Sequence, residues 1–183
     1  MSQLCDATRS QLLILDIQER LAGAMPTESM SLLTRNTRRL LQAAGLLNVP
    51  VLRSEQYPRG LGETVQALRD LLPPGMQHFE KTSFSCCGAP DFVSVATQRE
   101  QIIICGMETH VCVIQTALEL SAQGRAVYVV EDAVVSRDPS HKANALARMR
   151  QAGIIVTNHE SVLFEWLRNA RHEHFKAVSA LLK

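Results

Sequence analysis

A cysteine at the start of a predicted helix is the side chain best suited to nucleophilic chemistry. Cys112 lies in the run Gln101–Thr116, which predicts a buried strand at 102–105, a tight turn at Gly106 and then a helix. The N–H groups and partial positive charge at a helix N-terminus favour the thiolate, the nucleophilic form of cysteine. The same N–H groups can hold the oxyanion that forms when sulfur attacks a carbonyl carbon. The alternative is that Cys112 is an inert core residue, as free cysteines often are.

A carboxylate and an ammonium group are predicted at the same edge of the sheet as this cysteine. Asp16 ends the first predicted strand, Lys81 ends the third, and Cys112 follows the fourth. Because the carboxyl ends of parallel strands meet at one edge, these three side chains should lie together. Asp16 can accept the thiol proton, and Lys81 can keep Asp16 ionised. Taken singly, Asp16 is more simply explained as a turn residue and Lys81 as a solvated charge.

Six short apolar strands separated by helices must position these residues. The expected strands are 11–16, 49–53, 78–81, 102–105, 126–131 and 154–157. Helices are expected at 27–47, 63–72, 90–98, after Gly106 as far as Gly124, at 140–152, and from about 161 and 173, with loops at 54–62 and 82–88. This alternation predicts a three-layer α/β/α fold with a mostly parallel sheet covered on both faces.

Length, charge and cysteine content narrow the class of protein. The 183 residues predict a single domain, residues 1–183, and a net charge of +1 gives no reason to expect nucleic acid or a membrane surface as partner. Apolar runs are far shorter than the ~20 residues that span a bilayer, and we expect no secretory leader. Five cysteines without a C-x-x-C spacing favour free thiols in a reducing compartment, so we expect a cytoplasmic protein.

Four segments together resemble the isochorismatase-like cysteine hydrolases. They are Leu15–Gln18, Glu80–Ser85, Gly106–Thr116 and Val130–Arg137, and their order and spacing cover nearly the whole chain. The loop 54–62 and the tail 147–153 look closest to the branch of this family that lacks an assigned substrate.

The resemblance implies a fold, a catalytic triad and an oxyanion site. The fold would be Rossmann-like with strand order 3-2-1-4-5-6. Asp16 would be the base, Lys81 its cationic partner and Cys112 the nucleophile. A cis peptide bond would join Met107 to Glu108, and the backbone N–H groups of Glu108 and Cys112 would face the oxyanion. Family members form dimers up to octamers, so we expect a homo-oligomer.

Two departures from the family's patterns narrow the expected reaction. Nicotinamidase-type members carry an Asp-x-His metal cluster after the second strand, where this chain has Ser54-Glu55-Gln56-Tyr57, so we expect no metal and no other cofactor. Members that cleave the vinyl ether of isochorismate do not use the cysteine, which is present here. We therefore expect a metal-independent amidase that acts on a small amide or related C–N bond through a thioester.

Further assignments remain open on sequence alone. Gln18, Tyr57, Phe84 and His110 are candidates for the wall of a small-molecule pocket, with core or surface packing as the alternative. The competing functions are a catalytically silent member that binds partners and a thiol-redox protein in which Cys112 pairs with Cys86 or Cys87. The apolar C-terminal residues either form an interface between subunits or dock on the chain's own fold; they are Phe175, Val178, Leu181 and Leu182.

Overall fold

One parallel sheet organises the computed structural model, which describes residues 4–183. Its six strands lie in the order β3-β2-β1-β4-β5-β6, and every neighbouring pair is parallel. The strands are β1 (Ser10–Leu15), β2 (Val51–Gln56), β3 (Gln77–Lys81), β4 (Gln101–Met107), β5 (Ala126–Val135) and β6 (Ile155–Thr157). The predicted fold class and strand order are confirmed.

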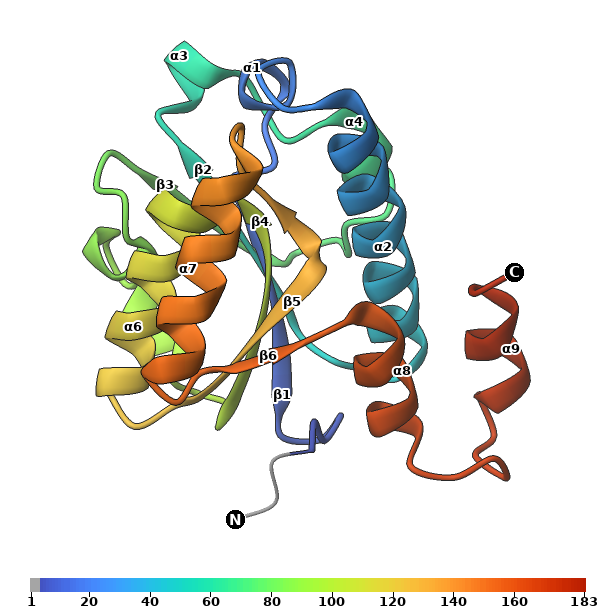
Figure 1. Ribbon diagram of the computed structural model, residues 1–183. Coiled ribbons are helices and arrows are strands. Elements are labelled where there is room, and N and C mark those ends of the chain that lie inside the picture. Colours follow the sequence, from blue (N-terminus) through green and yellow to red (C-terminus); the bar gives the residue numbers. More distant parts are fainter. Residues whose placement is uncertain (1–3) are drawn as a thin grey trace.

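Helices cover both faces of this sheet (Figure 1). Helices α2, α8 and α9 lie on one side of the sheet, and α6 and α7 lie on the other. The α-helices are α1 (Glu19–Ala22), α2 (Thr27–Leu46), α3 (Pro58–Leu61), α4 (Gln66–Arg69), α5 (Phe92–Ala96), α6 (Ile114–Ala122), α7 (Pro139–Gln151), α8 (His159–Leu167) and α9 (Phe175–Ala180). A 3-10 turn, η1 (Cys86–Gly88), and a π-helical turn, η2 (Thr109–Val113), complete the described elements.

The central strands are buried on both faces, and alternate residues enter two separate cores. In β1, Leu12 and Ile14 join the core under α2 and α8, whereas Leu13 and Leu15 join the core under α5, α6 and α7. Burying each such side chain contributes about 1.5–3 kcal/mol relative to leaving it exposed. This two-sided burial explains why the strands read as continuous apolar runs.

The C-terminal helix packs on its own chain. Val178 is fully buried in the core beneath α2 and α8. Arg39 of α2 donates from Nε to the Leu181 carbonyl at 2.8 Å, and the rings of Phe164 and Phe175 lie 6.3 Å apart. Of the two roles considered for the C-terminal residues, docking on the chain's own fold is the one observed.

Two segments after β1 and β2 differ from the prediction. Strand β2 continues to Gln56, where a loop was expected, because its pairing with β3 extends as far as Gln56 opposite Lys81. The helix expected at 63–72 is reduced to α4, because Thr64 is held in an extended bridge with Gln18 and by the Glu55 carboxylate. Polar residues can continue a strand when their side chains find buried partners.

The helix and strand that flank the predicted site also differ in extent. Helix α5 starts at Phe92, after Asp91 adopts a left-handed conformation with φ of 59°. Strand β5 runs to Val135, beyond its expected end at 131, and its pairing with β4 is interrupted by a register shift between Ile104 and Gly106. Such bulges redirect a strand and often lie beside functional sites.

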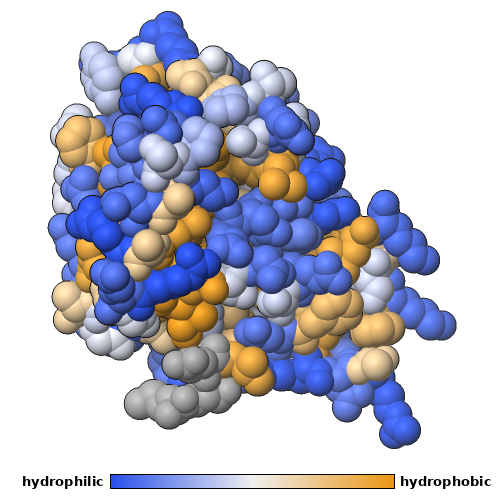
Figure 2. Space-filling model, in the orientation of Figure 1, coloured by the Kyte–Doolittle hydropathy of each residue, from blue (hydrophilic) through white to orange (hydrophobic). Residues whose placement is uncertain are grey.

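Hydrophilic residues cover most of the face seen in Figure 2, with apolar residues in smaller groups between them. Within residues 4–183, the chain contains no helix that is both long and apolar enough to cross a membrane.

Candidate active site

Asp16 and Lys81 form a buried ion pair at the carboxyl edge of the sheet. Lys81 Nζ lies 2.7 Å from Asp16 Oδ2, and neither side chain is exposed. Lys81 ends β3 and Asp16 directly follows β1, so β2 separates the two strands. The side chain of Lys81 therefore reaches across the end of β2 to meet the carboxylate.

The Lys81 ammonium is surrounded by further acceptors. It donates to Gln56 Oε1 at 2.6 Å and to the Phe84 carbonyl at 3.0 Å, with the Ser83 carbonyl at 3.3 Å. These acceptors offset the cost of burying a charged group. The arrangement fixes the cation beside Asp16, and the loop after β3 closes over it.

The backbone places the Asp16 carboxylate in a fixed turn. Asp16 has a positive φ of 54°, a conformation that aspartate tolerates better than most residues. Its N–H donates to the Ser54 carbonyl at 3.1 Å, and its own carbonyl accepts from the Gln18 N–H at 2.8 Å. The Ser54 hydroxyl donates to Asp16 Oδ1 at 2.8 Å.

Gly106 allows β4 to approach β1 directly beside Asp16. It pairs with Leu15 and has a φ of 146°, and a Cβ added here would lie 2.0 Å from the Leu15 carbonyl oxygen. Only glycine fits this conformation and this close approach. The glycine thus brings the chain segment that carries Cys112 against the turn that carries Asp16.

Cys112 lies in the π-helical turn η2 that connects β4 to α6. Cys112 is 6% exposed and belongs to the core under α5, α6 and α7. The Cys112 thiol is close enough to the Asp16 carboxylate for a hydrogen-bond contribution to the pKa values of both groups. Asp16, Lys81 and Cys112 are therefore brought together, as their positions after three different strands predicted.

The resting protonation state of Cys112 differs from the expectation. Burial, followed by the negative charge of Asp16, raises the pKa of the Cys112 thiol, and the Lys81 cation only partly opposes this. The raised pKa is opposite to the expected preference for the thiolate, because desolvation and the adjacent Asp16 carboxylate favour the protonated thiol. Attack by this thiol requires a base that removes its proton.

Asp16 has the properties of such a base. Burial raises the pKa of its carboxyl group above the usual value, against the opposing effects of Lys81 and Ser54. Burial disfavours the charged form of Lys81, but the negative charge of Asp16 prevails and raises the pKa of the ammonium. A carboxylate with a raised pKa is a stronger proton acceptor, and the adjacent cation offsets the charge that would develop on sulfur.

Glu108 starts the turn that carries Cys112, and Arg137 holds its side chain. The peptide bond between Met107 and Glu108 is cis. The Glu108 carboxylate accepts from the Arg137 N–H at 2.9 Å and from Arg137 Nη2 at 2.6 Å. Burial alone would raise the pKa of Glu108, but these hydrogen bonds and the charge of Arg137 hold it below the usual value.

The four candidate pocket residues occupy different environments. Gln18 is fully buried, and its amide bonds to the backbone of Gln56 and Gly62, which favours a bracing role over contact with a ligand. Tyr57 and Phe84 are 54% and 56% exposed. His110 is half-buried, with Nδ1 2.9 Å from Ser136 Oγ.

Several polar contacts at the site were not assigned from the sequence. They involve Ser54, Gln56, Cys86 and Arg137, whose side chains bond to the residues already described. The stretch Val130–Arg137 was noted as a family-like segment, so its arginine could have been found. Ser54 and Gln56 gave no signal because they fell in an expected loop.

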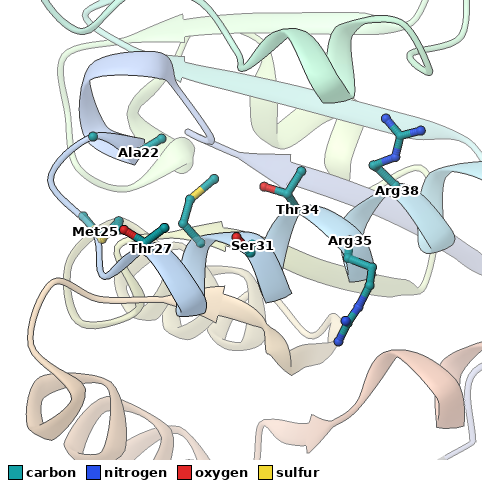
Figure 3. Close-up of a pocket in the computed structure, with 9 residues that line it drawn as sticks. Ala22, Met25, Thr27, Ser31, Thr34, Arg35 and Arg38 are labelled. Carbon is teal, nitrogen blue, oxygen red and sulfur yellow. The ribbon is translucent and has the colours of Figure 1, made fainter.

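Of two cavities in the structure, one includes a residue of the candidate active site and the other does not. One of about 370 Å³ lies between the segments after β2 and β3 and is lined in part by Tyr57, Lys81 and Thr82. Another of about 560 Å³ lies along α2 and the loop before it (Figure 3) and includes Met25, Arg35 and Arg38. Asp16, Lys81 and Cys112 do not line this second cavity, so it is separate from the candidate active site.

Relatives of known name match almost the whole chain. A zebrafish (Danio rerio) protein named isochorismatase domain-containing protein 2 is 38% identical, with 94% of this chain and 86% of that protein covered. A protein of Phytophthora sojae named secreted isochorismatase effector Isc1 is also 38% identical, with 95% of this chain and 84% of that protein covered.

Solved structures share the fold. A Caenorhabditis elegans protein described as the MAR1 ribonuclease has a TM-score of 0.93 and 36% identity, with 98% of this chain and 92% of that chain covered. The YcaC product of Escherichia coli, described as an octameric hydrolase of unknown specificity, has a TM-score of 0.89 and 25% identity, with 98% and 89% covered. The isochorismatase domain model matches residues 10–161. The chain therefore belongs to the isochorismatase family.

Proposed function

We propose that this protein is a metal-independent cysteine hydrolase that cleaves a small amide or related C–N bond. The observation that carries the proposal is the buried Asp16–Lys81 pair with the Cys112 thiol beside it. A core cysteine would not need a buried carboxylate and ammonium next to it, since burying two charges is costly. The family supplies the hydrolase fold on which this chemistry would operate.

The first half of the reaction forms a thioester. Asp16 takes the proton of Cys112 as the sulfur bonds to the substrate carbonyl carbon, and the carbonyl electron pair moves to oxygen. The backbone N–H groups of Glu108 and Cys112 stabilise this oxyanion. When the intermediate collapses, the C–N bond breaks, and the nitrogen leaves as ammonia or an amine with the proton from Asp16.

The second half hydrolyses the thioester. Asp16, ionised again, removes a proton from water while the water oxygen bonds to the thioester carbon. Collapse of this second intermediate breaks the C–S bond and releases the carboxylic acid, and the proton on Asp16 returns to sulfur. Lys81 stays protonated throughout and offsets the negative charge that passes between Asp16 and Cys112.

A panel of small primary amides and ureides, assayed for released ammonia, tests the proposal. Cys112→Ala should abolish turnover and keep the fold, as judged by circular dichroism. Cys105→Ala is the matched control, because Cys105 is fully buried in β4 and belongs to the other core. Full activity in Cys112→Ala, or an equal loss of activity in both variants, would contradict the proposed role of Cys112.

Two other functions make distinct predictions. A thiol-redox protein would form a reversible disulfide between Cys112 and Cys86 or Cys87, whereas all five cysteines are free here. Intact mass before and after mild oxidation, with peptide mapping, separates this function from hydrolysis. A catalytically silent member that acts by binding partners would give no turnover with any amide, and its Cys112 would not acylate.

The family and the composition support a proposal for where the protein acts and with which partners. We propose a homo-oligomer that acts on a small molecule in the cytoplasm, without nucleic acid or membrane as partner. The octameric E. coli structure supports self-association. Because one relative is named a secreted effector and three matching structures are described as established or putative ribonucleases, export and RNA cleavage should be assayed directly.

A further inference from the structure

The buried thiol of Cys86 contacts a residue of the candidate active site, but the reaction above does not use it. Cys86 is fully buried in η1, the 3-10 turn after β3. Its Sγ donates to Ser54 Oγ at 3.3 Å, and its N–H donates to Thr116 Oγ1 at 2.9 Å. Ser54 in turn donates its hydroxyl proton to Asp16 Oδ1. A chain of donors thus runs from Cys86 through Ser54 to the carboxylate.

The two oxygens of the Asp16 carboxylate have different partners. Oδ1 accepts from the Ser54 hydroxyl at 2.8 Å, and Oδ2 accepts from Lys81 at 2.7 Å. Contacts on both oxygens fix the plane of the carboxylate as well as its position. Since a base must present a lone pair along the direction of the proton that it takes, this orientation matters for proton transfer from Cys112.

The direction of each hydrogen bond follows from the chemistry of the groups. An ionised carboxylate only accepts, so the single Ser54 hydroxyl proton goes to Asp16, and the oxygen of Ser54 is left as an acceptor. The Cys86 thiol supplies a weak donor to that oxygen. Burial and the negative charge of Asp16 raise the pKa of Cys86 to about 12, so the thiol keeps its proton. Cys86 is therefore a neutral donor and not a second nucleophile.

We propose that Ser54 is a positioning residue that orients the Asp16 carboxylate toward Cys112, with Cys86 holding the Ser54 hydroxyl in place. This inference rests on the proposed role of Asp16 as the base for Cys112. It assigns the polar end of β2 and the turn after β3 to the active site, although both Ser54 and Cys86 are fully buried.

The test is the rate of Cys112 modification by iodoacetamide against pH, followed by peptide mass spectrometry. Asp16 and Cys112 titrate as a coupled pair, and reaction begins when the pair loses its first proton. Ser54→Ala removes a hydrogen bond to the ionised carboxylate, so the acidic limb of the profile should move up by about one pH unit. Ser54→Thr keeps the hydroxyl and should leave the limb within about 0.3 pH unit of the wild type.

Cys86 variants give a second, graded readout. Cys86→Ser keeps a donor to Ser54 and should retain the wild-type limb, whereas Cys86→Ala should move it in the same direction as Ser54→Ala by a smaller amount. Cys87 is half-buried, and its modification in the same digest serves as an internal standard for the amount of reagent. Thermal unfolding of each variant verifies that the folded state is being compared.

The outcomes separate this inference from the proposed function. Loss of the acidic limb in Asp16→Asn together with a shifted limb in Ser54→Ala supports both. Loss of the limb in Asp16→Asn with an unshifted limb in folded Ser54→Ala overturns the positioning role alone. A limb that persists in Asp16→Asn overturns the role of Asp16 as the base, and the positioning role with it.

Discussion

Lys81 Nζ lies 2.7 Å from Asp16 Oδ2 with both side chains shielded from solvent, and the two residues are 65 positions apart in the sequence. Two strand ends on either side of β2 bring them together. The pair places an ionisable base beside Cys112, whose thiol is protonated at rest because burial and Asp16 raise its pKa. Transfer of the Cys112 proton to Asp16 is thus the step that would produce the reactive thiolate.

Replacing Lys81 alone should destabilise the protein more than replacing Lys81 and Asp16 together. Lys81→Met leaves the Asp16 carboxylate buried without its cation and should lower the free energy of unfolding by about 3–5 kcal/mol. The double variant Asp16→Asn, Lys81→Met should be more stable than Lys81→Met alone. Urea denaturation of the wild type, both single variants and the double variant gives the coupling energy. A coupling energy near zero would contradict the buried pair.

Glu55 should make the folded protein sensitive to acid. Burial alone would raise its pKa, but hydrogen bonds from His78 and Thr64 and the charge of Arg53 lower the pKa to about 2 from its ordinary value of 4.5. Because the folded-state pKa is depressed, this carboxylate contributes stability that is present above pH 4.5 and lost as pH falls toward 2. The contribution is on the order of 2–3 kcal/mol.

A matched pair of substitutions isolates this effect. Glu55→Gln should flatten the fall in unfolding free energy between pH 5 and about pH 2. Glu80→Gln is the control, because Glu80 pairs with Glu55 in the strand register but is exposed to solvent. Equal pH profiles for Glu55→Gln and the wild type would show that Glu55 is not the group responsible.

Gly106 should not tolerate any side chain. Gly106 has a φ of 146°, and an added Cβ would lie 2.0 Å from the Leu15 carbonyl oxygen. The substitution Gly106→Ala must therefore separate β4 from β1. We expect destabilisation of more than about 3 kcal/mol, or failure to fold. Gly45→Ala is the control, since an added Cβ meets nothing within 4 Å in α2, and should stabilise the protein by about 0.5–1 kcal/mol. Normal thermal stability of Gly106→Ala would contradict the strand geometry.

Arg137 should affect the rate of Cys112 acylation, although its side chain is largely exposed. Its side chain is 64% exposed, but it holds the buried Glu108 carboxylate beside the proposed oxyanion site. Arg137→Gln should slow acylation of Cys112 by about tenfold to a hundredfold, because small displacements of a catalytic group are costly. Arg150→Gln removes an exposed pair with Glu131 and should leave the rate unchanged. Similar acylation rates in both variants would show that Arg137 does not position Glu108.

The apolar runs predicted the strands, and the family resemblance implied their order, but neither predicted the contacts at the strand ends. Apolar runs such as Ile102–Cys105 are visible because two-sided burial demands them. Ser54, Glu55 and Gln56 were assigned to a loop because they are polar. They extend β2 because their side chains are paired with Asp16, Thr64 and Lys81, which lie outside this strand. Burial that depends on such partners leaves no local pattern to detect.

The positions of the three candidate site residues could be predicted from the sequence, but their protonation states could not. Parallel strands put Asp16, Lys81 and Cys112 at one edge, which needs only topology. The pKa of Cys112 depends on how deeply the thiol is buried and on its proximity to Asp16. A helix N-terminus considered alone therefore gave the wrong direction.

Reaction with 4-nitrophenyl acetate tests the central claim most directly. This activated ester acylates nucleophilic thiols, releases coloured 4-nitrophenolate and leaves an acetyl group that peptide mass spectrometry can locate. The account predicts a rapid burst of about one nitrophenolate per chain with the acetyl group on Cys112, abolished in Cys112→Ala and slowed by a factor of about 10²–10⁴ in Asp16→Asn. Absence of a burst, acetylation at another residue, or an undiminished rate in Asp16→Asn would contradict it.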